Sequence, residues 1–133
     1  MAISFDSALG VHDDALRYRS QRASVLANNL ANLDTPGFKA RDINFKAAMQ
    51  QVQEVGSTLA LTRSNAAHQR GGVSPEGDAE LLYRTPTQPS IDGNTVEEHV
   101  EHAAYMENTL AFQATFTFLN SKFKGLTSAI RGE

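Results

Sequence analysis

Two histidines, His99 and His102, stand three residues apart among acidic residues, and this group is the nearest the chain comes to a metal site. Such side chains can converge on one face of a helix, as in zinc and di-iron sites. The pattern matches neither the His-Glu-x-x-His motif nor paired Glu-x-x-His motifs. His12 and His68 are isolated in the sequence. We therefore interpret His99 and His102 as part of a solvated first helical turn and predict no metal.

Other patterns that could do chemistry are incomplete. Asp92-Gly93-Asn94 lacks the spaced acids and the distal glutamate of a calcium loop. Glycines 71, 72 and 77 are not followed by the Lys-Ser/Thr and helix start of a phosphate loop. The chain has no cysteine, and no nucleophile, base and orienting acid can be assigned from spacing. The sequence predicts neither an enzyme nor a cofactor.

The overall composition argues against some classes of partner. The 133 residues suit one domain, and a formal net charge of −3 argues against nucleic acid as a partner. No run approaches the roughly 20 apolar residues that span a bilayer, so we expect no direct membrane insertion. The first residues lack the basic start and apolar core of a secretory signal, so we expect no cleaved signal peptide.

Three asparagines in five positions, Asn28, Asn29 and Asn32, close the first periodic segment. Asparagine is a mediocre helix former because its side chain competes for backbone groups, so these side chains are expected to have another task. One interpretation is a solvated polar face. The alternative is that they bridge to neighbouring subunits, where a buried polar residue can fix register.

The elements that must position these residues are mainly helical. Leucines and alanines at heptad spacing predict a helix from about residue 7 to 33, which Asp34-Thr35-Pro36-Gly37 stops with a type II turn. A second helix is predicted over 95–130, starting with a capping box of Thr95 and Glu98. Its apolar seam contains Leu110, Phe112, Phe116, Leu119, Phe123, Leu126 and Ile130. This seam fits either an intramolecular core or packing between molecules.

The middle of the chain is less regular. Phe45 to Val55 fits a short helix, residues 66–79 read as a mobile loop, and Leu81 to Tyr83 fit a short strand. We therefore expect a mainly α protein with an N-terminal helical region (1–35), an irregular middle region (36–94) and a C-terminal helical region (95–133). The two long helices would pair as a coiled coil in one structural domain.

The lengths of the two helices indicate that a single chain leaves apolar surface uncovered and needs a partner. The two helices would be about 40 and 54 Å long. They cannot bury all of their apolar surface against each other and a small polar middle region. A large exposed apolar stripe usually marks an interaction surface. Acidic helix starts and basic ends would also orient an antiparallel pair, with Asp13 or Asp14 near Lys122 or Lys124.

Three stretches carry a resemblance to a known family: residues 26–42, residues 92–96, and residues 107–114 with 121–124. Together they resemble the bacterial flagellar rod and hook axial proteins, and the last two favour the proximal rod members. A tyrosine is common where Phe112 stands, which is a mild departure. The resemblance assigns a family motif and subunit interface to Leu26, Asn28, Asn29, Leu30, Asn32, Asp34, Thr35, Pro36, Gly37 and Phe38.

The resemblance implies a structural subunit of the proximal rod, in the periplasmic space of the flagellar basal body. Such subunits stack helically around a channel, transmit torque, and leave the cell unfolded through the flagellar type III export apparatus. The implied partners are other copies of the chain, other rod proteins, and the basal-body adaptor and export gate at the rod base. A Phe with an apolar residue four positions later is associated with export. Phe45 and Met49 fit, as do Phe5 with Leu9 and Phe112 with Phe116.

A second class of function also fits the apolar stripes. A cytoplasmic helical adaptor or chaperone that binds a partner helix would explain them and the expected absence of a signal peptide. It would not explain the asparagine-rich helix end with its Asp-Thr-Pro-Gly stop. Cell fractionation discriminates between the two classes.

Overall fold

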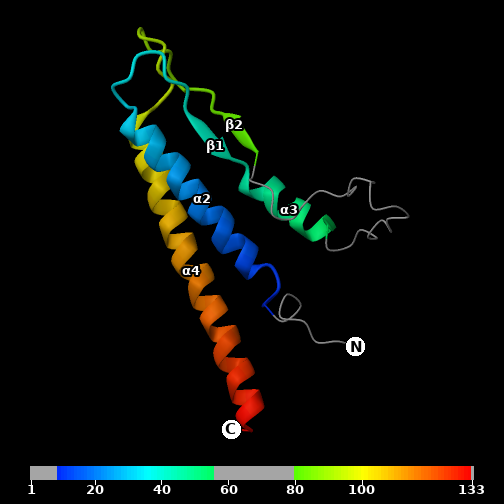
Figure 1. Ribbon diagram of the computed structural model, residues 1–133. Coiled ribbons are helices and arrows are strands. Elements are labelled where there is room, and N and C mark those ends of the chain that lie inside the picture. The colour runs from blue at the N-terminus through cyan, green and yellow to red at the C-terminus, as the bar shows by residue number, and fades with distance from the viewer. Residues whose placement is uncertain (1–8, 56–79, 133) are drawn as a thin grey trace, which may run out of the picture.

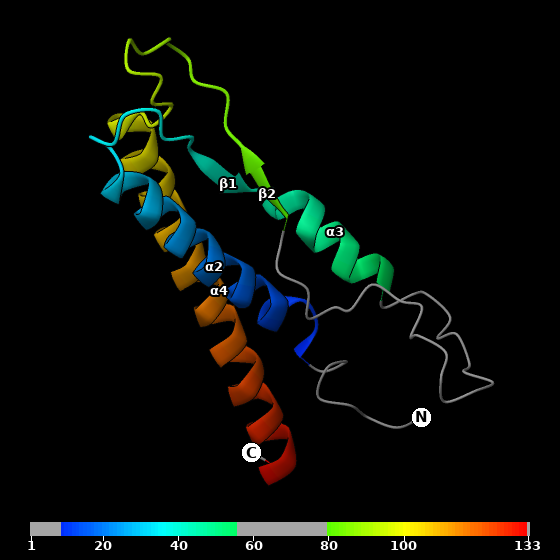
Figure 2. The ribbon, with the colours of Figure 1, turned by 45° about the horizontal axis from the view of Figure 1, so that its top comes forward.

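A pair of long helices dominates the computed structural model, which describes residues 9–55 and 80–132. Helix α2 (His12–Ala31) and helix α4 (Glu98–Arg131) run antiparallel and lie side by side (Figures 1 and 2). Because α4 has 34 residues and α2 has 20, the C-terminal part of α4 continues past the start of α2 (Figure 1). The prediction of a mainly helical protein whose terminal helices are in contact is confirmed.

Both ends of α2 lie inside the predicted range of 7–33. At the start, Gly10 has a φ of +60°, which takes the chain out of the helical path just before His12. At the other end, the Phe38 N–H donates to the Thr35 carbonyl over 3.3 Å, and Gly37 has a φ of +72°. A positive φ at the third position of such a turn is type II geometry, which glycine adopts without strain. The predicted turn is confirmed.

The predicted capping box at the start of α4 is wrong. The residue that precedes the helix is Glu97, which has extended backbone and no side-chain cap. The Thr95 hydroxyl instead accepts a hydrogen bond from the Ala40 N–H at 2.7 Å. A contact with a distant segment has therefore displaced a local capping pattern.

The middle region forms a small sheet and a third helix. Strand β1 (Arg41–Ile43) pairs antiparallel with β2 (Leu81–Tyr83), with Asp42 opposite Leu82. Helix α3 (Phe45–Val55) follows β1, and both pack against α2. The short helix and the strand at Leu81–Tyr83 are confirmed, whereas β1 was not predicted because two of its three residues are charged. The predicted mobile loop at 66–79 lies outside the described residues.

The described core is small and partly polar. Its buried apolar side chains are Ala15, Tyr18, Leu26, Ala40, Ile43 and Ala48. The buried side chains of α4 are all polar, namely Glu101, Asn108 and Thr115, and they recur every seven residues. The stripe of α4 that faces α2 is therefore polar. None of the helices within the described ranges combines the length and apolar character that a membrane crossing requires.

Candidate assembly surfaces and the polar network that supports them

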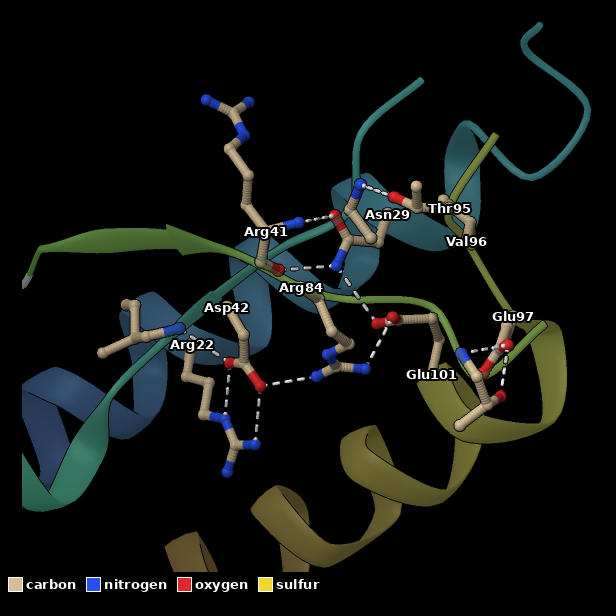
Figure 3. A network of polar contacts seen from close by, with 12 residues as sticks. Arg22, Asn29, Arg41, Asp42, Arg84, Thr95, Val96, Glu97 and Glu101 are labelled. Atoms are coloured by element: carbon tan, nitrogen blue, oxygen red, sulfur yellow. Dashed lines mark hydrogen bonds and ion pairs between the residues drawn. The ribbon is translucent and has the colours of Figure 1, made fainter. Parts of the chain in front are cut away.

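A network of charged side chains joins both long helices to the two strands (Figure 3). Arg22 on α2 donates two hydrogen bonds to the Asp42 carboxylate on β1, both 2.9 Å long. Arg84, just after β2, donates to Asp42 and, over 2.7 Å, to Glu101 on α4. We call Arg22, Asp42, Arg84, Glu101 and Asn29 the junction network. Paired charges at fixed geometry tie four elements into one unit.

The junction network controls the ionisation of Asp42. Burial by itself would raise the pKa of this carboxyl, but hydrogen bonds from Arg22 and Arg84 outweigh burial and leave the pKa below its usual value. The same hydrogen bond to Asp42 raises the pKa of Arg22. Asp42 and Arg22 are therefore both charged at neutral pH.

Asn29 connects the network to the backbone of β1. Its amide nitrogen donates to the Arg41 carbonyl at 2.7 Å and to a Glu101 carboxylate oxygen at 3.1 Å, and its oxygen accepts from the Arg41 N–H at 3.2 Å (Figure 3). The side chain thus pairs with a strand as a peptide group would. Asn29 is 1% exposed and Glu101 is fully buried, so both side chains act within the chain.

The two stretches of the family motif around the turn are in direct contact. The Asn94 side chain donates to the carbonyls of Asn32 and Leu33, at 3.1 and 2.7 Å, just past the end of α2. The Asn32 carbonyl also accepts from the Thr35 N–H at 3.1 Å. The Lys39 ammonium donates to the Gly93 carbonyl at 2.6 Å, and the Gly37 N–H to the Asp92 carbonyl at 3.0 Å. The turn after α2 is thereby fixed against the segment that leads into α4.

The remaining motif residues divide into supporting and surface groups. Leu26 is fully buried, and Leu30, Asn32, Leu33 and Phe38 are half-buried. Asn32 bonds locally, to the Asn28 carbonyl and the Thr35 hydroxyl. Asn28 and the turn residues Asp34, Thr35, Pro36 and Gly37 are exposed. The exposed members form one candidate surface, which we call the turn tip.

The apolar seam of α4 is mostly exposed in the single chain. Exposed fractions are 68% for Leu110, 58% for Phe116, 45% for Phe123 and 86% for Ile130, while Phe112 is close to half-buried at 37%. Only Leu119 and Leu126 are intermediate. Because the polar stripe faces α2, the aromatic seam is left as a second candidate surface.

The predicted ion pairs between the helix ends are absent. Within residues 9–55 and 80–132, neither Asp13 nor Asp14 contacts Lys122 or Lys124. The prediction was wrong because the start of α2 lies opposite Phe118 and not opposite the two lysines. The rings of His12 and Phe118 lie 6.1 Å apart. The orientation of the two helices comes instead from the junction network.

The candidate export residues lie at the start of α3. Phe45 packs beneath Arg19, with 4.2 Å between the guanidinium carbon and the ring centroid, and Met49 is half-buried. In the folded chain the Phe45 ring is therefore occupied by a contact with α2.

Sequence reasoning missed Arg22, Asp42, Arg84, Asn94, Glu101 and Asn108. The seven-residue spacing of Glu101, Asn108 and Thr115 was a usable signal, since it marks one helical stripe. The partners of Asp42 gave no local signal, because Arg22 and Arg84 are 20 and 42 residues away.

The site has the features of a structural assembly protein. Among the described residues, no group of three metal-binding side chains is present, and His102 lies only near Glu98, 3.9 Å away on the helix surface. What the fold offers is a braced helix pair with two exposed surfaces. These features define the class of a helical structural subunit.

Comparison with known proteins gives the family. The family model for flagella basal body rod proteins matches residues 9–39. The flagellar basal body rod protein FlgB of Aeromonas hydrophila is 45% identical over 135 residues, covering 100% of this chain and 99% of that protein. The FlgB proteins of Escherichia coli K12 and Cereibacter sphaeroides are 39% and 43% identical, with at least 97% of each chain covered.

The chain belongs to the FlgB family of flagellar basal body rod proteins. It is a structural component of the rod and not an enzyme.

Proposed function

We propose that this chain is a subunit of the proximal rod that assembles helically into the drive shaft around the export channel. The observation that carries the proposal is the exposed aromatic seam of α4, where Phe116 is 58% exposed and Phe123 is 45% exposed. An apolar face of this size on a rod-family protein is suited to other copies of the chain and to other rod proteins. The turn tip supplies a second contact at the opposite end of the helix pair.

Transmission of torque requires a subunit that does not shear internally. The junction network meets this need, because Asp42 and Arg84 connect α2, the strands and α4 through charged hydrogen bonds. Asn94 and Lys39 brace the turn in the same way. A load applied at either candidate surface would pass through these contacts.

The proposed location is the periplasmic space, reached through the flagellar type III apparatus in an unfolded state. At the rod base, the chain would meet the basal-body adaptor and the export gate. Phe45 and Met49 are the proposed export residues. In the folded chain the Arg19 guanidinium covers part of the Phe45 ring, so the whole ring would be accessible in an unfolded chain, which agrees with export before folding.

Export can be tested separately from assembly. Phe45→Ala is expected to lower the amount of chain secreted into the medium by a strain that cannot retain it in a rod. Lys46→Ala, at the adjacent exposed position, is the matched control. Equal secretion of the two variants would remove Phe45 from the export signal.

The rod function is tested by a clean deletion of the gene and electron microscopy of purified basal bodies. Rings without a rod or hook are expected, and the gene supplied in trans should restore both. Intact flagella in the deletion strain would overturn the proposal.

A further inference from the structure

The two outer edges of the small sheet differ in how their backbone groups are paired. At the edge of β1, the Asn29 side chain bonds to both the N–H and the C=O of Arg41. Strand β2 pairs with the other edge of β1, so β1 lies between Asn29 and β2 (Figure 1). Within residues 9–55 and 80–132, no side chain or strand pairs with the outer edge of β2 in the same way.

The hydrogen bonds between the strands show which backbone groups of β2 face outward. The Arg84 N–H donates to the Ala40 carbonyl over 2.9 Å, which makes these residues a hydrogen-bonded pair. Such pairs alternate along an antiparallel ladder, so the backbone of Leu82 faces β1, while Leu81 and Tyr83 direct their N–H and C=O groups away from it. Leu81 and Tyr83 thus each offer a donor and an acceptor at the outer edge.

The side chains of β2 do not protect this edge. Natural edge strands usually resist pairing with another strand through a lysine, a proline or a bulge. Strand β2 consists of Leu81, Leu82 and Tyr83, whose side chains are 43%, 44% and 74% exposed. An exposed apolar strand with outward backbone groups is suited to bind a further strand by backbone hydrogen bonds.

The residues on either side of β2 indicate which strand binds there. Glu80 precedes β2 and Arg84 follows it. When a second β2 lies antiparallel and is centred on Leu82, Glu80 falls opposite Arg84 of the second copy, and Leu81 falls opposite Tyr83 of the second copy. Opposite charges and aliphatic–aromatic pairs both stabilise neighbouring strands. A parallel arrangement would place like charges side by side, so the charges favour the antiparallel pair of identical strands.

We propose that the outer edge of β2 pairs with β2 of a second copy, in an antiparallel two-fold contact centred on Leu82. Leu81 and Tyr83 of each copy exchange both N–H···O bonds with the residue opposite. The Arg84 guanidinium keeps its bonds within the junction network and has further N–H donors for Glu80 of the second copy. An edge of three residues buries far less than the roughly 1,200 Å² of a stable interface, so the pairing is weak and reversible.

This inference goes beyond the proposed rod function and does not depend on it. Copies stacked in a rod share one direction along its axis, whereas the contact through β2 relates two copies by a two-fold axis. The pairing is therefore a property of the chain in solution. Either proposal can fail without the other.

Disulfide trapping tests the register, because the chain has no natural cysteine. In the two-fold contact, residue 82 lies opposite its own copy in a non-hydrogen-bonded pair, with Cα atoms about 4.5 Å apart, a distance that a disulfide spans. Glu80→Cys, on the same face of the strand, is the matched control, because the two copies of residue 80 are about 14 Å apart. Under mild oxidation, Leu82→Cys should form the interchain disulfide about tenfold faster than Glu80→Cys. Equal rates would overturn the proposal.

A second measurement places like charges at the two-fold axis. Leu82→Lys sets two ammonium groups opposite each other and should weaken self-association about tenfold in sedimentation velocity. Because Leu82 is 44% exposed, urea unfolding of this variant should be nearly unchanged. Self-association that Leu82→Lys leaves unchanged would overturn the proposal and assign the contact to another surface. A natural chain that stays monomeric up to about 1 mM would also overturn it.

Discussion

At the residue scale, a single carboxylate, that of Asp42, joins several elements of the fold. Asp42 accepts from Arg22 and Arg84, which come from either side of β1 in the sequence and from different elements of the fold. A charge-assisted hydrogen bond of this kind is roughly twice as strong as a neutral one. Removing the shared acceptor leaves the partly buried Arg22 without its carboxylate partner and leaves Arg84 with Glu101 alone.

We expect Asp42→Asn to lower the free energy of unfolding by about 2 kcal/mol, a value below that of a fully buried pair because the Asp42 side chain is 20% exposed. Urea unfolding followed by circular dichroism measures the change. Asp34→Asn is the matched control, since Asp34 is exposed on the turn tip and should change stability very little. Equal effects of the two substitutions would contradict the role of Asp42.

Asp42 also predicts how stability depends on pH. Its folded pKa lies below its ordinary value of 3.8, so the folded chain binds fewer protons than the unfolded chain between the two values. The stabilisation is present in full above the ordinary pKa and is lost as the pH falls from there through the folded pKa. Unfolding measured from pH 5 downward should therefore show a steeper loss for the natural chain than for Asp42→Asn. Parallel curves would contradict the assignment.

At the element scale, α4 has two stripes with opposite character. Glu101, Asn108 and Thr115 face α2, and the aromatic seam faces solvent. Polar residues at core positions of a helix pair specify register at a cost in stability. Asn108 shows both effects, because its amide nitrogen donates to the Arg19 carbonyl at 2.9 Å while its buried oxygen has no hydrogen-bond partner in the described part of the chain.

Asn108→Leu should therefore raise the free energy of unfolding by about 1 kcal/mol, because it removes an unsatisfied buried acceptor and adds apolar contact. Thermal unfolding measures the change. Asn120→Leu, at an exposed position of the same helix, is expected to leave stability nearly unchanged. A large loss of stability in Asn108→Leu would mean that the bond to Arg19 dominates.

At the scale of the whole molecule, the two candidate surfaces lie on one braced body. The turn tip is at the end where α2 meets the turn, and α4 extends away from it to the C-terminus (Figure 1). This arrangement suits a subunit that has neighbours along its length. The aromatic seam should then matter for assembly and not for the folding of one chain.

The double variant Phe116→Ala and Phe123→Ala should abolish swimming while the isolated chain unfolds within about 1 kcal/mol of the natural one, since both rings are about half exposed or more. Swimming in soft agar is measured in the deletion strain supplied with each gene. Gln113→Ala with Asn120→Ala, on exposed positions of α4, is the matched control. Normal swimming of the phenylalanine variant would remove the seam from the interface.

Local patterns in the sequence determined the elements and the family. Heptad spacing predicted the two long helices, the Pro36-Gly37 turn was predicted by its residue types, and α3 and β2 fell within their predicted ranges. These features depend on residues that are near one another in the sequence, so the sequence alone predicts them. The capping box at Thr95 failed because its hydroxyl is used by Ala40, 55 residues away.

Only the tertiary structure decided which residues meet across the fold. A charged residue such as Asp42 or Glu101 has the same local sequence signature whether it is solvated or paired, so the junction network could not be predicted. The sequence also did not determine which face of α4 meets α2. Hydrophobicity favours burial of the aromatic seam, but either α2 or another molecule could bury it. Within one chain the register set by Asn29, Glu101 and Asn108 turns the polar stripe inward, and the apolar seam is left exposed.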